Sequence, residues 1–191
     1  MTRLFPTRRI PATLLVALSA CASAGGQNYH DKNMDFGSIR TVAVMPFVNL
    51  SHDNLAGDRV RDVFTTMLLA SGSVYVVPYG EVARVSARAG IVNPSSPSVE
   101  EMIKLGTQLK IDGVITGVVK EYGELRSGSA SGNTVSVSLQ LLETATGKIV
   151  WTGSSTKGGI SFKDRLLGGS GAPMNDVTEA VCDDLVAKLF R

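Results

Sequence analysis

The sequence predicts one α/β domain, with a mixed sheet and flanking helices in a three-layer-like arrangement, and three observations predict it. Apolar stretches at 41–47 and 74–77 enclose an amphipathic stretch at 55–70, which is the pattern of a parallel βαβ unit. Residues 134–142 alternate between apolar and polar side chains, as in a strand with one packed face. Residues 177–189 repeat apolar side chains at helical spacing.

The βαβ unit opens the domain. The stretch Thr41–Phe47 is apolar on both faces, so we expect a buried strand with Pro46 at its end, because proline cannot donate a ladder hydrogen bond. Residues 48–54 are polar and predict a loop. The second strand, 74–77, should lie parallel to the first after a right-handed crossover. The intervening helix over 55–70 carries one apolar stripe, made of Val60, Val63, Phe64, Met67 and Leu68.

Two shorter helices are predicted next. The first covers 81–89 and ends at Gly90. After a loop at 93–97, Ser98 and Glu101 have the spacing of a capping box, in which the serine caps the helix and the glutamate reaches back. This pair predicts the start of a third helix.

The second half of the domain is predicted to be mainly β. A strand at 113–122 leads into a Gly/Ser loop at 124–133, and the alternating strand 134–142 follows. After a turn at 144–147, a strand over 148–153 returns, with Ile149 and Trp151 on one face. In the alternating strand, one face holds Val135, Val137, Leu139 and Leu141, and the other holds Thr134, Ser136, Ser138 and Gln140.

A final helix closes the domain. Asp176 and Glu179 have capping-box spacing and should open it. Cys182 lies at the rim of its apolar stripe, so we expect a small buried core residue and not a reactive thiol. The residues expected to point inward are Val177, Ala180, Val181, Leu185 and Leu189.

Residues 1–20 have the three parts of a secretory signal peptide. A basic start is followed by a short apolar run at 12–18 and by Ser19-Ala20 directly before Cys21. The apolar run is shorter than the ~20 residues that span a bilayer. Leu18-Ser19-Ala20-Cys21 also resembles the bacterial lipobox, which implies cleavage before Cys21 and its acylation. The alternatives are an ordinary signal peptide or a single buried helix.

The predicted domain plan therefore has three parts. Residues 1–20 form the lipoprotein signal peptide, 21–38 a lipidated flexible tether of low apolar content, and 39–191 the α/β periplasmic domain. The two residues after Cys21 are not acidic. By resemblance to lipoprotein sorting signals, this implies anchoring in the outer membrane.

Charge and cysteine content exclude several classes of function. The leader holds three of the 19 basic residues and none of the 17 acidic ones, so 16 basic and 17 acidic residues remain, a formal charge of −1. Neither this balance nor any basic run indicates nucleic-acid binding. If Cys21 is acylated, only Cys182 remains, and no intrachain disulfide can form.

We predict that the protein is not an enzyme and binds no cofactor or metal. Residues 128–132 have nucleophile-elbow spacing, but Ala130 occupies the serine position. Residues 146–148 resemble the end of a phosphate loop, but a hairpin turn explains them. His30 and His52 are far apart and neither has a partner at metal-ligand spacing.

The order of the pieces resembles a known family. Thr-Val-Ala-Val-Met-Pro-Phe-Val-Asn-Leu-Ser at 41–51, Ser-Gly-Ser-Val-Tyr-Val-Val at 71–77, Asp-Gly-Val-Ile-Thr-Gly at 112–117 and the hairpin at 135–151 carry the resemblance. They resemble outer-membrane lipoproteins related to the curli secretion channel CsgG and, more distantly, the penicillin-binding-protein activator LpoB. The resemblance covers about 39–190 and implies a periplasmic fold similar to the TolB N-terminal domain.

Three functions follow as hypotheses. The first is a docking or assembly factor for envelope export or surface assembly, anchored in the outer membrane through Cys21 and bound to envelope proteins. The second is a subunit of an oligomeric secretion pore, with 113–143 and 153–168 as membrane hairpins. Charges and Gly/Ser content in both segments disfavour it. The third is an LpoB-like activator of a peptidoglycan synthase. A homo-oligomer is possible in each case.

Overall fold

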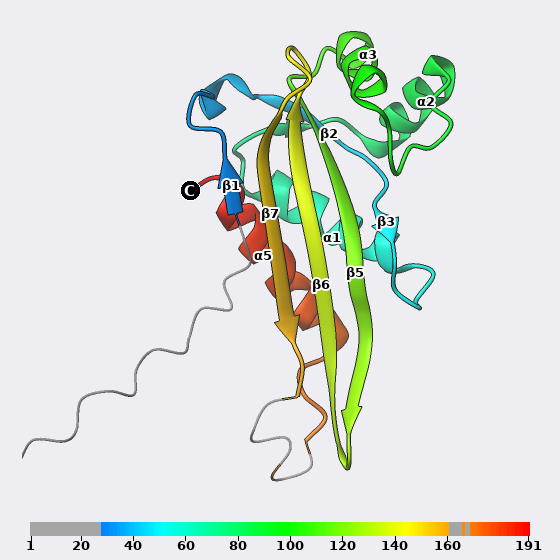
Figure 1. Ribbon diagram of the computed structural model, residues 1–191, viewed down its shortest axis with the longest axis vertical. Helices are drawn as coiled ribbons and strands as arrows, with labels where there is room; N and C mark the ends of the chain where they lie inside the picture. The colour runs from blue at the N-terminus through cyan, green and yellow to red at the C-terminus, as the bar shows by residue number, and fades with distance from the viewer. Residues whose placement is uncertain (1–27, 161–165, 167–168) are drawn as a thin grey trace, which may run out of the picture.

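A long, mixed β-sheet forms the centre of the molecule (Figure 1). The structure is a computed structural model that describes residues 28–160, 166 and 169–191. Within these residues it contains a seven-stranded sheet and four α-helices, which confirms the predicted α/β class. The predicted signal peptide, Cys21 and part of the predicted hairpin at 153–168 lie outside the described residues.

The strands occur in the sheet in the order β1-β7-β6-β5-β2-β4, and β3 pairs with β5. The pairs β2–β4, β2–β5 and β3–β5 are parallel, whereas β5–β6, β6–β7 and β1–β7 are antiparallel. The strands are β1 (Asn28–His30), β2 (Thr41–Val44), β3 (Val48–Asn49), β4 (Tyr75–Val76), β5 (Gly113–Ser127), β6 (Ala130–Glu143) and β7 (Ile149–Gly158). The helices are α1 (Ala56–Ala70), α2 (Tyr79–Ala89), α3 (Val99–Leu109) and α5 (Met174–Leu189), with a 3₁₀ turn at Phe36–Ser38.

Helices cover the two faces of the sheet unequally. One core packs α1 and α5 on the first face, around Phe64, Trp151 and Leu185. A smaller core packs α2 and α3 on the other face, and Figure 1 shows these helices at one end of the molecule. Strand β2 supplies Val42 and Val44 to the first core and Ala43 to the second, as expected for a central strand, and Met45 directly after it also packs in the second core. The three-layer arrangement is thus present at one end, and most of the second face stays uncovered.

The predicted βαβ unit is confirmed, with one addition. Strands β2 and β4 are parallel, and α1 begins one residue later than expected. The predicted loop at 48–54 instead begins with β3, whose Val48 and Asn49 lie opposite Val118 and Val119 of β5. A two-residue strand has too little sequence pattern to be recognised without its partner.

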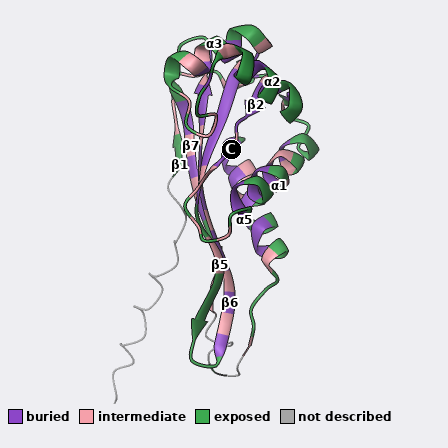
Figure 2. Cartoon of the chain, turned by 90° about the vertical axis from the view of Figure 1, so that its right-hand side faces the viewer, coloured by how far each residue is buried: buried purple, intermediate pink, exposed green. Residues whose placement is uncertain are grey.

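The Gly/Ser segment at 124–133 is not a loop, so this prediction was wrong. Strands β5 and β6 stay paired to Ser127 and Ala130, and a two-residue turn connects them. Gly128 has a φ of 61°, which suits this tight turn. Continuous cross-strand hydrogen bonding holds small polar residues in a strand despite their weak propensity. The hairpin extends past the helices (Figure 2).

Two register shifts redirect side chains in this part of the sheet. One shift, at Lys120, lets Val119 and Tyr122 both pack on the first core although they are three residues apart. The other, at Leu141/Leu142, buries Val150 next to Trp151 and leaves Ile149 43% exposed. Ile149 and Trp151 therefore do not share a buried face, contrary to the sequence prediction.

Helix α5 begins before its predicted cap. It starts at Met174 after Pro173 and has no side-chain cap, so Asp176 and Glu179 do not form the predicted capping box. The helix continues upstream because proline is tolerated at a helix start. Ala180 is exposed, not inward, whereas the other four predicted inward residues are buried. None of the described helices has both the length and the apolar character needed to cross a membrane.

Residues 28–38, which were predicted to belong to a flexible tether over 21–38, pack on the folded body. Residues 28–30 form β1 on the edge of β7, and Asp31 N donates to Val150 O at 2.8 Å. Met34 and Phe36 pack against the first core. The segment has few apolar residues, but these few and the strand pairing suffice to dock it.

Candidate functional site

The sequence-predicted site residues do not assemble into one centre. Cys21 lies outside the described residues, so its lipidation stays a prediction. Cys182 is fully buried, and its Sγ lies 3.8 Å from Val60 O. Burial, and to a lesser degree the charge of Glu179, raises the pKa of the Cys182 thiol to about 12. This confirms Cys182 as an inert core residue.

The two histidines have different surroundings. Nε2 of His30 lies 2.9 Å from the carbonyl oxygen of Lys188, and His52 is exposed in the β3–α1 connection. No group of three His, Cys, Asp or Glu side chains that could hold a metal ion occurs in the described part of the chain.

Residues 128–132 lie at the hairpin end, and 146–148 form the predicted turn, where Gly147 has a φ of 71°.

The uncovered face of the sheet carries a surface rich in hydroxyl groups. Three neighbouring strands contribute to it in register: Gln140 lies between Thr116 and Thr152, and Ser138 between Val118 and Ser154. Hydrogen bonds tie the surface together, because Gln140 Nε2 donates to Thr116 Oγ1 at 2.9 Å. We call this surface the open face; it comprises Thr116, Val118, Ser136, Ser138, Gln140, Thr152, Ser154 and Thr156.

A groove of about 410 Å³ runs across the open face. Val48 of β3 lies at one end and Ser154 of β7 at the other, while the loop Ser95–Pro97 and Met102 of α3 form its wall. Lys120 is the one charged residue among those that line the groove. The register shift in β5 falls at this residue and accounts for the direction of its side chain. Hydroxyls, one amide and one ammonium group suit the binding of a polar or acidic partner segment by hydrogen bonds.

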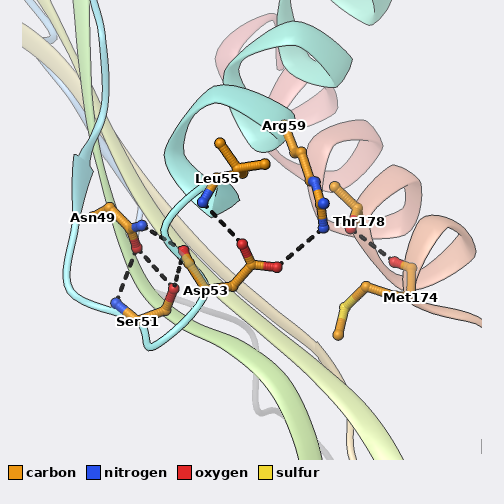
Figure 3. A network of polar contacts seen from close by, with 7 residues as sticks. All are labelled: Asn49, Ser51, Asp53, Leu55, Arg59, Met174 and Thr178. Carbon is orange, nitrogen blue, oxygen red and sulfur yellow. Dashed lines mark hydrogen bonds and ion pairs between the residues drawn. The ribbon is translucent and has the colours of Figure 1, made fainter.

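A second feature, the edge loop at 49–55, directly follows Val48, which lines the groove. Asn49 Oδ1 accepts hydrogen bonds from Ser51 N at 3.0 Å and from Ser51 Oγ at 2.7 Å, and Asn49 Nδ2 donates to Asp53 O at 2.7 Å (Figure 3). Asp53 in turn accepts from Leu55 N and Arg59 Nη1. These contacts fix the loop between β3 and α1.

The edge loop presents apolar side chains to solvent. Leu50 is 65% exposed and Leu55 is 54% exposed. The backbone of both residues is nevertheless held in place, because Leu50 N donates to Val119 O and Leu55 N donates to Asp53 Oδ1, each at 2.9 Å. A fixed loop loses little conformational entropy on binding, so exposed leucines on it are suited to contact a partner protein. The groove and the edge loop together form the candidate site.

Sequence reasoning found only part of this site. The part of the open face that β6 contributes was predicted as a solvent-facing side of the sheet, since Ser136, Ser138 and Gln140 alternate with apolar residues. The polar alternation of Thr152, Ser154 and Thr156 continues it and could have been recognised as a longer β7. The wall at 95–97 had no signal, because it depends on where α3 packs.

Comparison with known proteins links this chain to a family of the cell envelope. The sequence pattern of the family described as "Peptidoglycan-synthase activator LpoB" matches residues 19–156. A putative lipoprotein of Neisseria meningitidis serogroup B is 26% identical over 172 residues, which is 88% of this chain and 80% of that protein.

Solved structures show the same fold at low sequence identity. The lipoprotein GNA1162 from Neisseria meningitidis has a TM-score of 0.57 at 22% identity, covering 78% of this chain and 98% of that one. A PelC dodecamer subunit from Paraburkholderia phytofirmans has a TM-score of 0.57 at 14% identity, covering 85% and 96%. The LpoB C-terminal domain from Escherichia coli has a TM-score of 0.50 at 16% identity, covering 66% and 88%. At these identities the structures show a shared fold alone. The predicted relation to LpoB rests on the family match over residues 19–156, and no comparison supports the predicted relation to CsgG or TolB.

Proposed function

Because the chain belongs to the family of the peptidoglycan-synthase activator LpoB, we propose that it is a lipid-anchored activator of a peptidoglycan synthase. The family match over residues 19–156 carries this proposal. It favours the third hypothesis from the sequence over the first, the docking factor for export. In this function the protein acts by binding and needs no catalytic group of its own.

We further propose that Cys21 is acylated and holds the protein in the outer membrane, with the domain in the periplasm. The basic start, the short apolar run and the small residues before Cys21 support the anchor. A related Neisseria protein is itself described as a putative lipoprotein. Two or more acyl chains on one residue meet the requirement for stable anchoring.

The groove and the edge loop are the proposed contact with the synthase. Hydroxyl groups and Lys120 would bind a polar segment, while Leu50 and Leu55 would pack on an apolar patch. Binding activates an enzyme only if the active conformation is bound more tightly than the inactive one. The fixed geometry of the edge loop favours such selectivity, since it fits one arrangement of the partner.

The test is glycan polymerisation by a peptidoglycan synthase of the same cell, measured on lipid-linked precursor with and without the full chain. We expect wild-type protein and Lys148→Glu, on the β6–β7 turn outside the groove, to raise the rate. Lys120→Glu reverses the charge in the groove and should lose most of the gain. No rate increase with any synthase of the cell would refute the function, and equal gains for both variants would refute the groove.

Two other predictions keep less support. The export docking factor and the secretion pore both depend on the likeness to the curli channel, which the comparisons do not support. A homo-oligomer stays a prediction: the PelC structure is described as a dodecamer, but at 14% identity this likeness concerns the fold alone.

A further inference from the structure

The docking of β1 leaves a short link between the proposed anchor and the folded body. Asn28 is paired with Gly153, so only residues 22–27 separate Cys21 from the sheet. Fully extended, seven Cα steps span about 25 Å. If Cys21 is acylated, as in the proposed function, the edge of the domain around β1 must stay close to the bilayer.

The exit point of this link is fixed on the body. Three side-chain donors converge on the carbonyl oxygen of Lys188: Trp151 Nε1 at 3.3 Å, His30 Nε2 at 2.9 Å and Asn28 Nδ2 at 3.5 Å. This carbonyl lies in the last turn of α5, where helix carbonyls lack intrahelical partners. The contacts hold β1 at the end of α5, so the link to the proposed anchor leaves the folded body at a defined position.

The surface at this side has an unusual composition. A hollow of about 610 Å³, lined by Arg40, Tyr75 and Phe190, shares His30 and Arg191 with a second hollow around Tyr29 and Lys32. They therefore form one continuous region, which we call the tether-end surface: Tyr29, Lys32, Arg40, Tyr75, Phe190 and Arg191. Three aromatic side chains are prominent there, because Tyr29 is 50% exposed, Tyr75 60% and Phe190 43%.

Three basic side chains belong to the tether-end surface. Lys32, Arg40 and Arg191 are all exposed. Two carboxylates lie nearby and keep their negative charge, but each turns an oxygen to its own backbone: Asp31 Oδ1 accepts from Asn33 N, and Asp35 Oδ1 accepts from Gly37 N, each at 2.9 Å. Exposed aromatic rings next to basic side chains are the composition of segments that lie at a membrane–water interface.

We propose that the tether-end surface rests on the phospholipid surface in which Cys21 is anchored. Lys32, Arg40 and Arg191 would contact lipid phosphates, and the three aromatic rings would lie at the level of the head groups. β1 and β3 lie on opposite sides of the central strands (Figure 1). In the same view the C-terminus lies beside β1, and the loop after β3 lies at the other side of the molecule. In this proposal the edge loop points away from the membrane, where a synthase can reach it.

Single labelled cysteines in the full, acylated chain test this orientation. Cys182 is buried and Cys21 is blocked by acylation, so a thiol-reactive fluorophore should label only an introduced cysteine. The protein is reconstituted in vesicles of phosphatidylethanolamine and phosphatidylglycerol that contain a head-group nitroxide lipid. We expect several-fold stronger quenching for Tyr29→Cys and Phe190→Cys than for Leu50→Cys on the edge loop.

The outcomes separate this proposal from the proposed function. Equal quenching at positions 29, 190 and 50, with acylation verified by mass spectrometry, overturns the membrane contact while synthase activation can still be measured independently. Absence of acyl chains on Cys21 overturns the membrane contact as well, because the short link then does not keep the domain at the bilayer. As a charge test, Lys32→Glu with Arg191→Glu should weaken quenching at position 29, whereas Lys148→Glu should not.

Discussion

At the residue level, Cys182 carries a thiol that is fully buried in the core. Its side chain is 0% exposed between α1 and α5, and burial raises the pKa of its thiol to about 12. A thiol that is neither exposed nor ionised at neutral pH reacts slowly with electrophiles. In the proposed periplasmic location, this burial would protect the protein against oxidation and mixed disulfides.

We predict that Cys182 in the native protein does not react with a chromogenic disulfide reagent at pH 8. The thiol should become reactive only when the chain unfolds, so its labelling rate should rise with the denaturant-induced transition. Stoichiometric labelling of the native protein within minutes would contradict the buried position. Cys182→Ala is the control for background reaction.

A second residue-level prediction concerns the ion pair at the end of α5. Lys188 Nζ lies 2.6 Å from Asp184 Oδ2 and donates to Ser154 O at 2.8 Å. Partial burial alone would raise the pKa of Asp184. The hydrogen bonds of Lys188 and Ser155, together with the charges of Lys188 and Lys157, outweigh the burial and lower this pKa. A lowered folded-state pKa gives stability that is present above the unfolded pKa and lost as the pH falls through the folded one.

Asp184→Asn should therefore reduce the free energy of unfolding by about 1 kcal/mol at pH 7. The difference from wild type should shrink as the pH falls below about 4, where the unfolded carboxyl takes up its proton. Urea melts at both pH values measure it. Asp183→Asn, at the exposed neighbouring position, should change little, and a pH-independent deficit for Asp184→Asn would contradict the assignment.

At the level of elements, the sheet has one packed face and one open face. Val137 is fully buried against α1 and α5, whereas Ser136 points to the open face and its Oγ lies 2.8 Å from Thr156 Oγ1. Adjacent residues of a strand face opposite sides. A carboxylate introduced at these two positions should therefore have very different effects.

Val137→Asp should destabilise the domain by several kcal/mol, because it buries an unpaired carboxylate. Ser136→Asp should cost less than about 1 kcal/mol, since its charge stays in water. The measurement is the urea midpoint of each variant against wild type. Equal midpoint shifts would mean that the face assignment is wrong.

The elements also show where sequence reasoning succeeds and where it fails. The β2–α1–β4 unit and the alternation of β6 could be predicted because their apolar periodicity reflects burial directly. The hairpin end at 124–133 could not, because its small residues form strands only through pairing with each other. For the same reason, the docking of β1 and the wall of the groove were not predictable from local pattern.

At the level of the whole molecule, the two proposed contacts lie on different sides. The tether-end surface is the proposed contact with the membrane, and the groove and edge loop are the proposed contact with a synthase. The short link restricts how far the body can move, so the partner must approach it. This division depends on Cys21.

Cys21→Ala should leave the protein unprocessed or in the soluble fraction. The substitution removes the acyl anchor and lies outside the folded body, so the melting temperature of the domain should not change. Fractionation of cells, with wild type as the control, measures the distribution. A processed Cys21→Ala protein that stays with the outer membrane would contradict the anchor.

Site-specific photo-crosslinking in intact cells can show whether the proposed partner, a peptidoglycan synthase, binds at the groove. A photoreactive amino acid replaces Lys120 in the groove or, as the control, Lys148 on the β6–β7 turn, and mass spectrometry identifies the crosslinked protein. The account predicts a peptidoglycan synthase crosslinked from position 120 and not from position 148. Crosslinks from position 120 only to export proteins, or only to another copy of this chain, would contradict it.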